Sequence, residues 1–455
     1  MNIKDTIHKL YKRIAGSNFL KSVLTLSSGV VVAQAINFLG MPVVGRVYSP
    51  SAIGDYTLIT SNAAILSAVA CLGMMTSFMI PKEHEEARGL GRLVTGSTVL
   101  ITSLAIGVLW LCSGFFRIFH TEETPYSVSL LVLWLYIVFN TVSNFCYAYV
   151  NRHKLYRVMF WNPIITAGIN VGVGIVFGLL GWGFVGYTTA HILSFAVNIL
   201  HLLRHANAFA RIENPEYRVI PLLKNYKRFP LYQMPANLVS SLRTQLPVQA
   251  IEALYTSTAL GMYSMALKIL SLPVTLLATP VNRVYFQEAS QRYNRGEDIG
   301  EFSFKILETN IKIAILPISL LIILGEWIFA IFLGEQWREA GSFAAVIGMH
   351  QLILFCSNCL SGYFVIIKKN LWELFFSIAT LALNILLVIV AWYFHIPVMV
   401  FLMILSALQT VSILLSQMAF FHHTGFDIKR YLMFAAKYIA IPVVLSFGIK
   451  LLLFR

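Results

Sequence analysis

Long apolar runs separated by short polar connections occupy the chain from residue 22 to its end. Each run has roughly 20 residues or more, enough for an α-helix to cross the apolar core of a bilayer. The pattern predicts twelve helices and, from a last run that contains Lys437 and Lys450, a thirteenth C-terminal helix whose lysines must reach the interface. The expected spans are 22–44, 52–80, 93–113, 126–150, 158–180, 183–203, 229–253, 258–282, 307–333, 339–366, 371–393, 397–421 and 431–453.

Composition agrees with this pattern. Of the 455 residues, 58% are hydrophobic and 12% are charged, whereas soluble proteins carry about 25% charged residues. A water-soluble fold is therefore excluded, and we expect an all-α integral membrane protein. The cysteines lie in apolar runs without metal-ligand or disulfide spacing, so we expect packing roles and no metal site. They are Cys71, Cys112, Cys146, Cys356 and Cys359.

Positive charge is unevenly distributed among the connections. With the N-terminus in the cytoplasm, the cytoplasmic segments contain twenty-five Lys and Arg residues, and the external connections contain three, Arg46, Arg117 and Arg338. Cytoplasmic loops of membrane proteins carry such an excess. We therefore expect a multi-pass protein with a retained cytoplasmic segment at 1–21. The longest external connection, roughly 114–125, leaves no room for an external catalytic domain.

A short motif occurs twice. YSPSAIGDY at 48–56 matches YTSTALGMY at 255–263, 207 residues later, at its Tyr, Ala, Gly and Tyr positions. Asn170 and Asn384 form a weaker pair in the fifth and eleventh spans. Chance similarity of short loops is the alternative, but the copies hold equivalent topological positions. An even number of helices separates them, which predicts parallel repeats.

Two parallel six-helix lobes follow from this repeat. Transporters built in this way bind substrate between their lobes near the middle of the membrane and expose it to each side alternately. The expected parts are an N-terminal segment at 1–21, an N-lobe at 22–203, a basic cytoplasmic linker at 204–228, a C-lobe at 229–421, and an extension at 422–455 that holds the thirteenth helix.

The residues around the first copy of the motif resemble a known family. The stretch that runs from LSSG at 26–29 through Ala33-Gln34, Asn37 and Pro42 to RVYSPSAIGDY at 46–56 is similar to the opening of Wzx-type polysaccharide repeat-unit flippases. Residues 229–263 are similar to the start of their second lobe. That family shares a superfamily with MATE-type multidrug exporters and lipid II flippases.

The resemblance implies a MATE-like fold and a specific activity. A protein of this kind moves an undecaprenyl-pyrophosphate-linked oligosaccharide from the cytoplasmic to the periplasmic leaflet of a bacterial inner membrane. The product enters polysaccharide biosynthesis of the lipopolysaccharide O-antigen or capsule type. The implied partners are this lipid-linked substrate and membrane lipids, and other polysaccharide-assembly membrane proteins remain open as partners.

Charged side chains inside the spans are candidate site residues, because inserting each one costs roughly 2.5–3.5 kcal/mol. Arg243 and Lys268 lie near the middle of the seventh and eighth spans, and Lys312 lies closer to the cytoplasmic end of the ninth. Together they predict a central cationic cavity for a diphosphate, since Arg offers a planar fork and Lys a compact charge. The alternatives are pairing of Arg243 and Lys268 with backbone carbonyls or Glu252, and extension of Lys312 to the cytoplasm.

Polar stripes are the second candidate feature. Side chains at steps of four, three and four lie on one face of a helix, and the seventh span has such a stripe. The first span offers a matching pair. We expect both to line a hydrated groove and to bind sugar hydroxyls, and interhelical hydrogen bonding is the alternative. These residues are Gln233, Asn237, Ser240 and Thr244 in the seventh span, and Gln34 and Asn37 in the first.

Three further features have simpler explanations beside functional ones. Arg46 belongs to the family motif, and it either gates the external side and joins the cationic set or forms a surface ion pair with Asp55. His191 and His350 are more typical of packed histidines than of proton carriers. The basic cytoplasmic loops determine topology first and attract anionic headgroups second. They contain Arg152, Lys154, Arg157, Lys224, Lys227 and Arg228.

Other functions fit the sequence less well. A cation-coupled multidrug exporter of the same architecture would place a carboxylate in its first helix, and 22–44 has no Asp or Glu. A glycan polymerase or ligase needs acidic or histidine residues on a sizeable external loop. A scaffold leaves the buried cations unexplained. We therefore expect a transporter without enzymatic activity, catalytic residues, a cofactor or a nucleic-acid partner.

Overall fold

The structure, a computed structural model, describes residues 18–111, 124–272 and 278–453. Within these ranges the chain is almost entirely helical and contains no strand, which confirms the predicted all-α class. Most of the predicted N-terminal segment, Cys112 and Arg117 lie outside the described residues.

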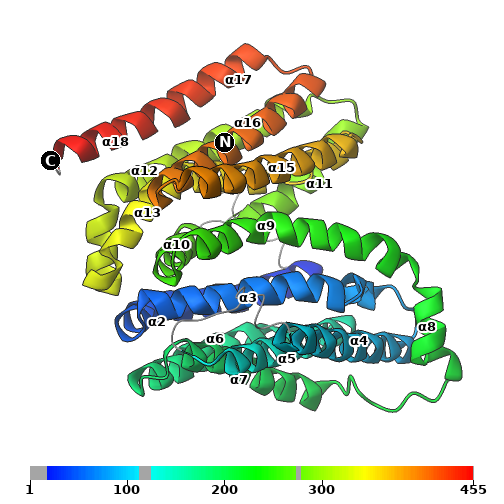
Figure 1. The fold of residues 1–455 in the computed structure, drawn as a ribbon. Coiled ribbons are helices and arrows are strands. Elements are labelled where there is room, and N and C mark those ends of the chain that lie inside the picture. Colours follow the sequence, from blue (N-terminus) through cyan, green and yellow to red (C-terminus); the bar gives the residue numbers. More distant parts are fainter. Residues whose placement is uncertain (1–17, 112–123, 273–277, 454–455) are drawn as a thin grey trace. The chain divides into compact units, whose positions relative to one another are not determined.

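Figure 1 shows the helices of the first half of the chain, from blue to green. A 3-10 helix at Met74–Met79 follows α3, a short one at Pro215–Tyr217 precedes α8, and a π-helical turn at Phe229–Gln233 leads into α9. The helices are α2 (Asn18–Val47), α3 (Pro50–Ala70), α4 (His84–Leu111), α5 (Tyr126–Arg152), α6 (Tyr156–Leu179), α7 (Gly183–His205), α8 (Val219–Asn225) and α9 (Met234–Leu254).

The second half continues with long helices. A 3-10 turn at Glu335–Trp337 separates α12 from α13, and a π-helical turn at Ala436–Ala440 lies between α17 and α18. The helices are α10 (Ser257–Leu270), α11 (Thr279–Asn294), α12 (Ile299–Leu333), α13 (Arg338–Cys359), α14 (Tyr363–Ile366), α15 (Asn370–Phe394), α16 (Val398–His423), α17 (Ile428–Ala435) and α18 (Ile441–Leu453).

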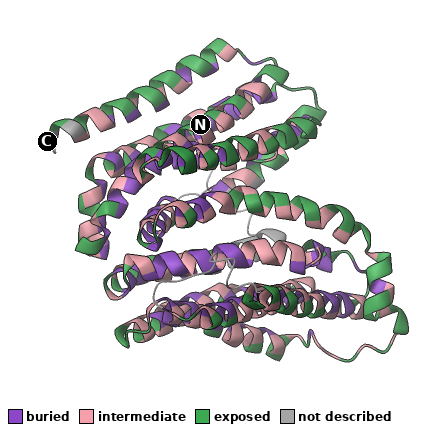
Figure 2. Cartoon of the chain, in the orientation of Figure 1, coloured by how far each residue is buried: buried purple, intermediate pink, exposed green. Residues whose placement is uncertain are grey.

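Ten helical stretches within the described residues are long and apolar enough to cross a membrane, including 428–450 near the C-terminus. The predicted spans 52–80, 229–253 and 258–282 are not among them. Polar residues recur along α3 and α9, and α10 has only 14 residues. These three helices depend more on protein neighbours than on lipid. Figure 2 shows that much of α3 and α10 is buried, whereas α15 is largely exposed.

The chain divides into two compact units. The first comprises residues 1–48 and 58–245, and the second comprises 49–57 and 246–455. Two of the three boundaries fall inside helices, at Thr57/Leu58 in α3 and at Gln245/Leu246 in α9, and the third lies between α2 and α3. The lobe limits inferred from the sequence, 22–203 and 229–421, remain a prediction.

The duplicated motif makes the same contacts in both copies. The backbone N–H of Ala52 donates to Ser49 Oγ at 3.2 Å, and that of Ala259 donates to Thr256 Oγ1 at 3.1 Å. Each hydroxyl thereby caps the helix that follows it. The preceding tyrosine hydroxyls also donate to backbone carbonyls, Tyr48 to Gly174 at 2.6 Å and Tyr255 to Ile396 at 2.7 Å.

The two motif glycines lie in one close contact within the second unit. A Cβ atom built on Gly54 would lie 1.8 Å from the carbonyl oxygen of Ser257, and one on Gly261 would lie 1.8 Å from that of Pro50. The contact is reciprocal, because Pro50 and Ser257 are equivalent positions of the repeat. Only glycine allows the start of α3 and the start of α10 to approach this closely.

The C-terminal helix packs on α12. The Nζ atom of Lys450 donates to Glu326 Oε1 at 2.8 Å, and Ser342 Oγ donates to the same oxygen at 2.5 Å. Lys450 thus forms an ion pair with α12, and its extension to the interface stays a prediction.

Candidate functional site

A polar pocket of about 370 Å³ lies within the first unit, among α2, α5, α6 and α7. Its lining includes Gln34 and Asn37 of α2, which the sequence had singled out. The other polar lining residues are Asn140, Ser143, Asn144 and Tyr147 of α5, Asn162, Thr166 and Asn170 of α6, and Asn198 of α7. We call it the amide pocket.

Helical spacing explains how these side chains reach one pocket. Asn162, Thr166 and Asn170 follow at steps of four and so share one face of α6. Asn140 and Asn144 do the same on α5, where Asn144 Nδ2 donates to Asn140 Oδ1 at 3.0 Å. The rule that identified the stripe of α9 would also have found these residues. The sequence could not show that the two faces meet.

Three amide groups of the pocket keep a buried atom without a hydrogen-bond partner: Asn162 Nδ2, Asn170 Oδ1 and Asn198 Oδ1. Asn162 and Asn198 are 7% and 5% exposed. A buried polar atom without a partner loses roughly 1–3 kcal/mol of hydration. The amide pocket therefore offers both a donor and acceptors to a polar ligand or to water.

His191 of α7 determines how one of these amides is oriented. Its Nδ1 atom lies 3.0 Å from the carbonyl oxygen of Tyr187 and donates to it. In the neutral ring Nε2 then accepts from Asn170 Nδ2, at 2.7 Å. This leaves Asn170 Oδ1 as the free acceptor. The structure thus confirms the prediction of a packed, hydrogen-bonded histidine.

A smaller pocket of about 210 Å³ shares Asn140 and Asn144 with the amide pocket and adds Asn237 of α9. Asn237 Oδ1 accepts from Gln233 Nε2 at 2.9 Å. Of the α9 stripe, the structure thus brings Asn237 to the same polar region as Gln34 and Asn37. Gln233, Ser240 and Thr244 line neither pocket, and Thr244 Oγ1 donates to the carbonyl of Ser240 at 3.1 Å.

The predicted cationic residues have different surroundings. Arg243 is half-buried in α9 and forms no hydrogen bond or ion pair with a described residue. Lys268 is exposed in the last turn of α10, which ends at Leu270, and its predicted place near the middle of the membrane stays a prediction. Lys312 Nζ pairs with Glu308 at 2.6 Å. Arg46 Nη1 donates to the carbonyl of Pro42 at 3.0 Å.

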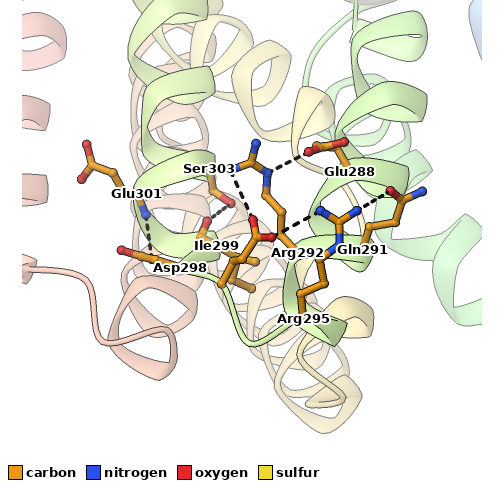
Figure 3. A network of polar contacts seen from close by, with 9 residues as sticks. Glu288, Gln291, Arg292, Arg295, Asp298, Ile299, Glu301 and Ser303 are labelled. Carbon is orange, nitrogen blue, oxygen red and sulfur yellow. Dashed lines mark hydrogen bonds and ion pairs between the residues drawn. The ribbon is translucent and has the colours of Figure 1, made fainter.

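A third pocket, of about 410 Å³, lies in the second unit beside the turn between α11 and α12. Figure 3 shows the polar network of this turn, in which Arg292 Nε pairs with Glu288 at 2.9 Å and Arg295 Nη1 pairs with Glu297 at 3.3 Å. Asp298 caps α12 by accepting from the N–H of Glu301 at 3.1 Å. These groups satisfy one another, so the network is structural.

The two pockets of the first unit have no charged side chain in their lining. Amides and hydroxyls can donate and accept hydrogen bonds, as sugar hydroxyls do. Phe195 and Tyr147 add aromatic surface to the amide pocket. This lining suits a neutral polyhydroxyl group and gives an organic cation no carboxylate partner.

The sequence from residue 43 to residue 342 matches the family described as Polysaccharide biosynthesis protein. No curated protein matches it. Among solved structures, the inward closed conformation of the lipid II flippase MurJ is similar with a TM-score of 0.69 at 13% identity, over 94% of this chain and 97% of that one.

An inward-facing multidrug resistance MATE family transporter of the MOP superfamily gives a TM-score of 0.57 at 13% identity, over 88% of this chain and 99% of that one. At this identity the likeness shows the fold, and it confirms the predicted MATE-like architecture. The family match covers well over half of the chain. The chain therefore belongs to the polysaccharide biosynthesis protein family, and its fold is shared with flippases and exporters.

Proposed function

We propose that this protein is a flippase that moves an undecaprenyl-diphosphate-linked oligosaccharide from the cytoplasmic to the outer leaflet of a bacterial inner membrane. The family is that of polysaccharide biosynthesis, and the fold is shared with a lipid flippase. The amide pocket is the observation that carries the proposal. Its neutral, two-way hydrogen-bonding lining fits sugar hydroxyls, and three of its buried amide atoms have no partner.

The diphosphate needs a different partner, because the amide pocket is uncharged. Arg243 is the strongest candidate, since it is half-buried and unpaired among the described residues. Its guanidinium can form two parallel hydrogen bonds with a phosphate. Lys268 and Arg46 complete the proposed cationic set. Lys312 is the weakest member, because Glu308 already neutralises its charge.

Membrane potential supplies a direction for this transport. With the N-terminus in the cytoplasm, as the charge distribution predicts, the diphosphate moves from the negative to the positive side. A headgroup with about two negative charges gains on the order of 4–5 kcal/mol when it crosses 100 mV. Alternating access driven by this potential requires no coupling ion.

The exporter of organic cations is the second function with this fold. Neither pocket of the first unit has a carboxylate, and α2 contains no acidic residue. A cationic drug would therefore lack a counter-charge at the sites that the structure describes. Drug tolerance on overexpression separates the two functions, since only the exporter raises it.

Leaflet-resolved labelling of the lipid-linked glycan tests the proposal in cells. Arg243→Ala combined with Lys268→Ala should leave the labelled glycan on the inner leaflet at unchanged protein abundance. Arg228→Ala combined with Lys224→Ala, which removes two exposed cations beside α8, is the matched control. Normal export in the first double variant would show that these cations do not bind the diphosphate.

A further inference from the structure

A group of basic side chains lies where α5 ends and α4 begins, in the first unit. The rings of His84 and His153 are stacked, with centroids 4.2 Å apart and planes 9° from parallel. Arg152 Nε donates to His84 Nδ1 at 3.3 Å. Tyr149 closes one side, with its ring 4.9 Å from that of His153. Both histidines are exposed, so the group is open to solvent.

Arg88 of α4 belongs to the same group. Its charge and those of His84 and Arg152 all lower the pKa of His153, after the larger effect of burial. The Nε atom of Arg88 is buried and has no hydrogen-bond partner. Among the described residues, none of His84, Arg88, Arg152 and His153 forms an ion pair. We call these four residues the basic cluster.

The neighbouring carboxylates are engaged elsewhere. Glu85 accepts from the N–H groups of Glu213 and Asn214, the second at 2.9 Å. Glu86 Oε1 accepts from Tyr226 OH at 2.9 Å. Both acids thus hold the 204–228 connection against α4, and neither forms an ion pair with the basic cluster, although the charge of Arg88 contributes, after the hydrogen bonds from Asn214 and Glu213, to lowering the pKa of Glu85.

The internal repeat shows that the turn does not need these cations. Lys154 and Lys368, 214 residues apart, both have a positive φ, 55° and 58°. Each N–H donates to the carbonyl three residues before it, at 2.9 Å to Asn151 and 3.1 Å to Val365. In the second copy, Ile366 and Ile367 occupy the positions of Arg152 and His153. The same turn therefore forms without charge at these two positions.

At another turn of the protein, two arginines are compensated by carboxylates. At the turn between α11 and α12, Arg292 and Arg295 both pair with carboxylates (Figure 3). At the turn between α5 and α6, by contrast, four basic groups without an ion pair to any described residue lie together, and Arg152 Nη1 donates to the carbonyl of Phe78 at 3.5 Å. Such a group attracts an anion that brings several acceptor oxygens.

We propose that His84, Arg88, Arg152 and His153 form a binding site for a phosphate or diphosphate group. Arg88 and Arg152 supply planar guanidinium donors, and the imidazole of His153 adds N–H donors when it is protonated. The ligand is a phosphate carried either by a lipid headgroup at the membrane surface or by a soluble molecule. The site is separate from the amide pocket, and it does not depend on the proposed transport activity.

The site should bind more tightly at lower pH. An anion between the cations removes the repulsion that lowers the pKa of His153, so binding raises that pKa and takes up protons. Affinity then increases as pH falls through the histidine range, from about 7.5 to 6. The other titratable or charged groups around the cluster are Glu83, Glu85 and Glu86 of the 82–88 region, Tyr149 and Lys154 of α5 and its turn, and Tyr217 and Tyr226 of the 204–228 connection.

Binding of inorganic pyrophosphate to the purified full chain in phosphatidylcholine nanodiscs tests the site. Arg88→Gln combined with Arg152→Gln should raise the Kd by about tenfold or more, which corresponds to two lost charge-assisted contacts. Lys82→Gln combined with Lys154→Asn removes two exposed cations from the same two turns and should change the Kd by less than about twofold, as expected for screened charges. Equal Kd values in the two double variants would overturn the proposal.

Two further measurements make the test specific. The variant Arg152→Ile with His153→Ile introduces the residues found at the equivalent positions of the second half, Ile366 and Ile367. It is used if the Arg88→Gln/Arg152→Gln variant does not fold. The tightening of binding between pH 7.5 and 6 should be smaller in His84→Asn with His153→Asn than in the native protein, which separates the histidines from titration of pyrophosphate itself. An unchanged pH dependence would contradict a role for the histidines.

Lipid composition identifies the source of the phosphate. Phosphatidylglycerol in the nanodisc should raise the pyrophosphate Kd of the native protein by a larger factor than that of the Arg88→Gln/Arg152→Gln variant if headgroups occupy the basic cluster. An equal effect on both proteins assigns the site to a soluble phosphate. Either outcome supports the site, whereas absence of pyrophosphate binding to the native protein in phosphatidylcholine at pH 6 contradicts it.

Discussion

Three asparagine side chains of the amide pocket have polar atoms that are buried and unpaired among the described residues, which does not favour stability. In an interior where most buried polar atoms are paired, such atoms are typical of sites that receive a ligand or ordered water. His191 of α7 differs from these amides, because both of its ring nitrogens form hydrogen bonds. Polar side chains of α6 and α7 can therefore be fully hydrogen-bonded within the protein.

This contrast yields a prediction for Asn162→Ala. The variant removes a buried donor that has no partner, so the free energy of unfolding should change by less than about 1 kcal/mol. Export of the lipid-linked glycan should fall severalfold, because the pocket loses a donor to a sugar hydroxyl. Thermal unfolding in detergent and leaflet-resolved labelling measure the two effects. Asn225→Ala, at an exposed position of α8, is the control, and equal export in the two variants would argue against the pocket.

At the scale of elements, the start of α3 and the start of α10 depend on a contact that admits no side chain. Gly54→Ala would place a methyl group against the carbonyl of Ser257 and force the helices apart. We expect a loss of about 1–3 kcal/mol in stability, as for overpacked cores. Gly168→Ala in α6 meets nothing within 4 Å and should leave stability unchanged or raise it, because alanine favours the helix.

Thermal unfolding of the two glycine variants in one detergent compares them directly. Equal unfolding temperatures would show that the close approach of α3 and α10 does not contribute to stability.

Sequence patterns predicted the long apolar helices well, because a membrane-crossing helix can be recognised from the length and hydropathy of its own residues, without knowledge of its neighbours. They failed where a helix ends inside a predicted span. The run at 52–80 was predicted as one helix, yet α3 stops at Ala70 because Leu72 and Gly73 have positive φ, and a 3-10 helix follows. The amide pocket was predicted only in part, since periodicity shows which residues share a face but not which faces meet.

At the scale of the whole chain, the two copies of the motif share interactions as well as sequence. Both copies cap the following helix, bind a backbone carbonyl through tyrosine and meet through glycine. The turns at Lys154 and Lys368 repeat this equivalence further along. Side chains at equivalent positions nevertheless differ, and the amide pocket and the basic cluster both belong to the first unit.

Transport by the purified protein is the central claim of this account. The direct measurement uses vesicles that contain an undecaprenyl-diphosphate oligosaccharide and the reconstituted protein, and follows the protection of the glycan from an impermeant glycosidase. The account predicts that the initially protected half of the glycan becomes cleavable with the native protein, and much more slowly with Asn162→Ala. Cleavage no faster than in protein-free vesicles would contradict it.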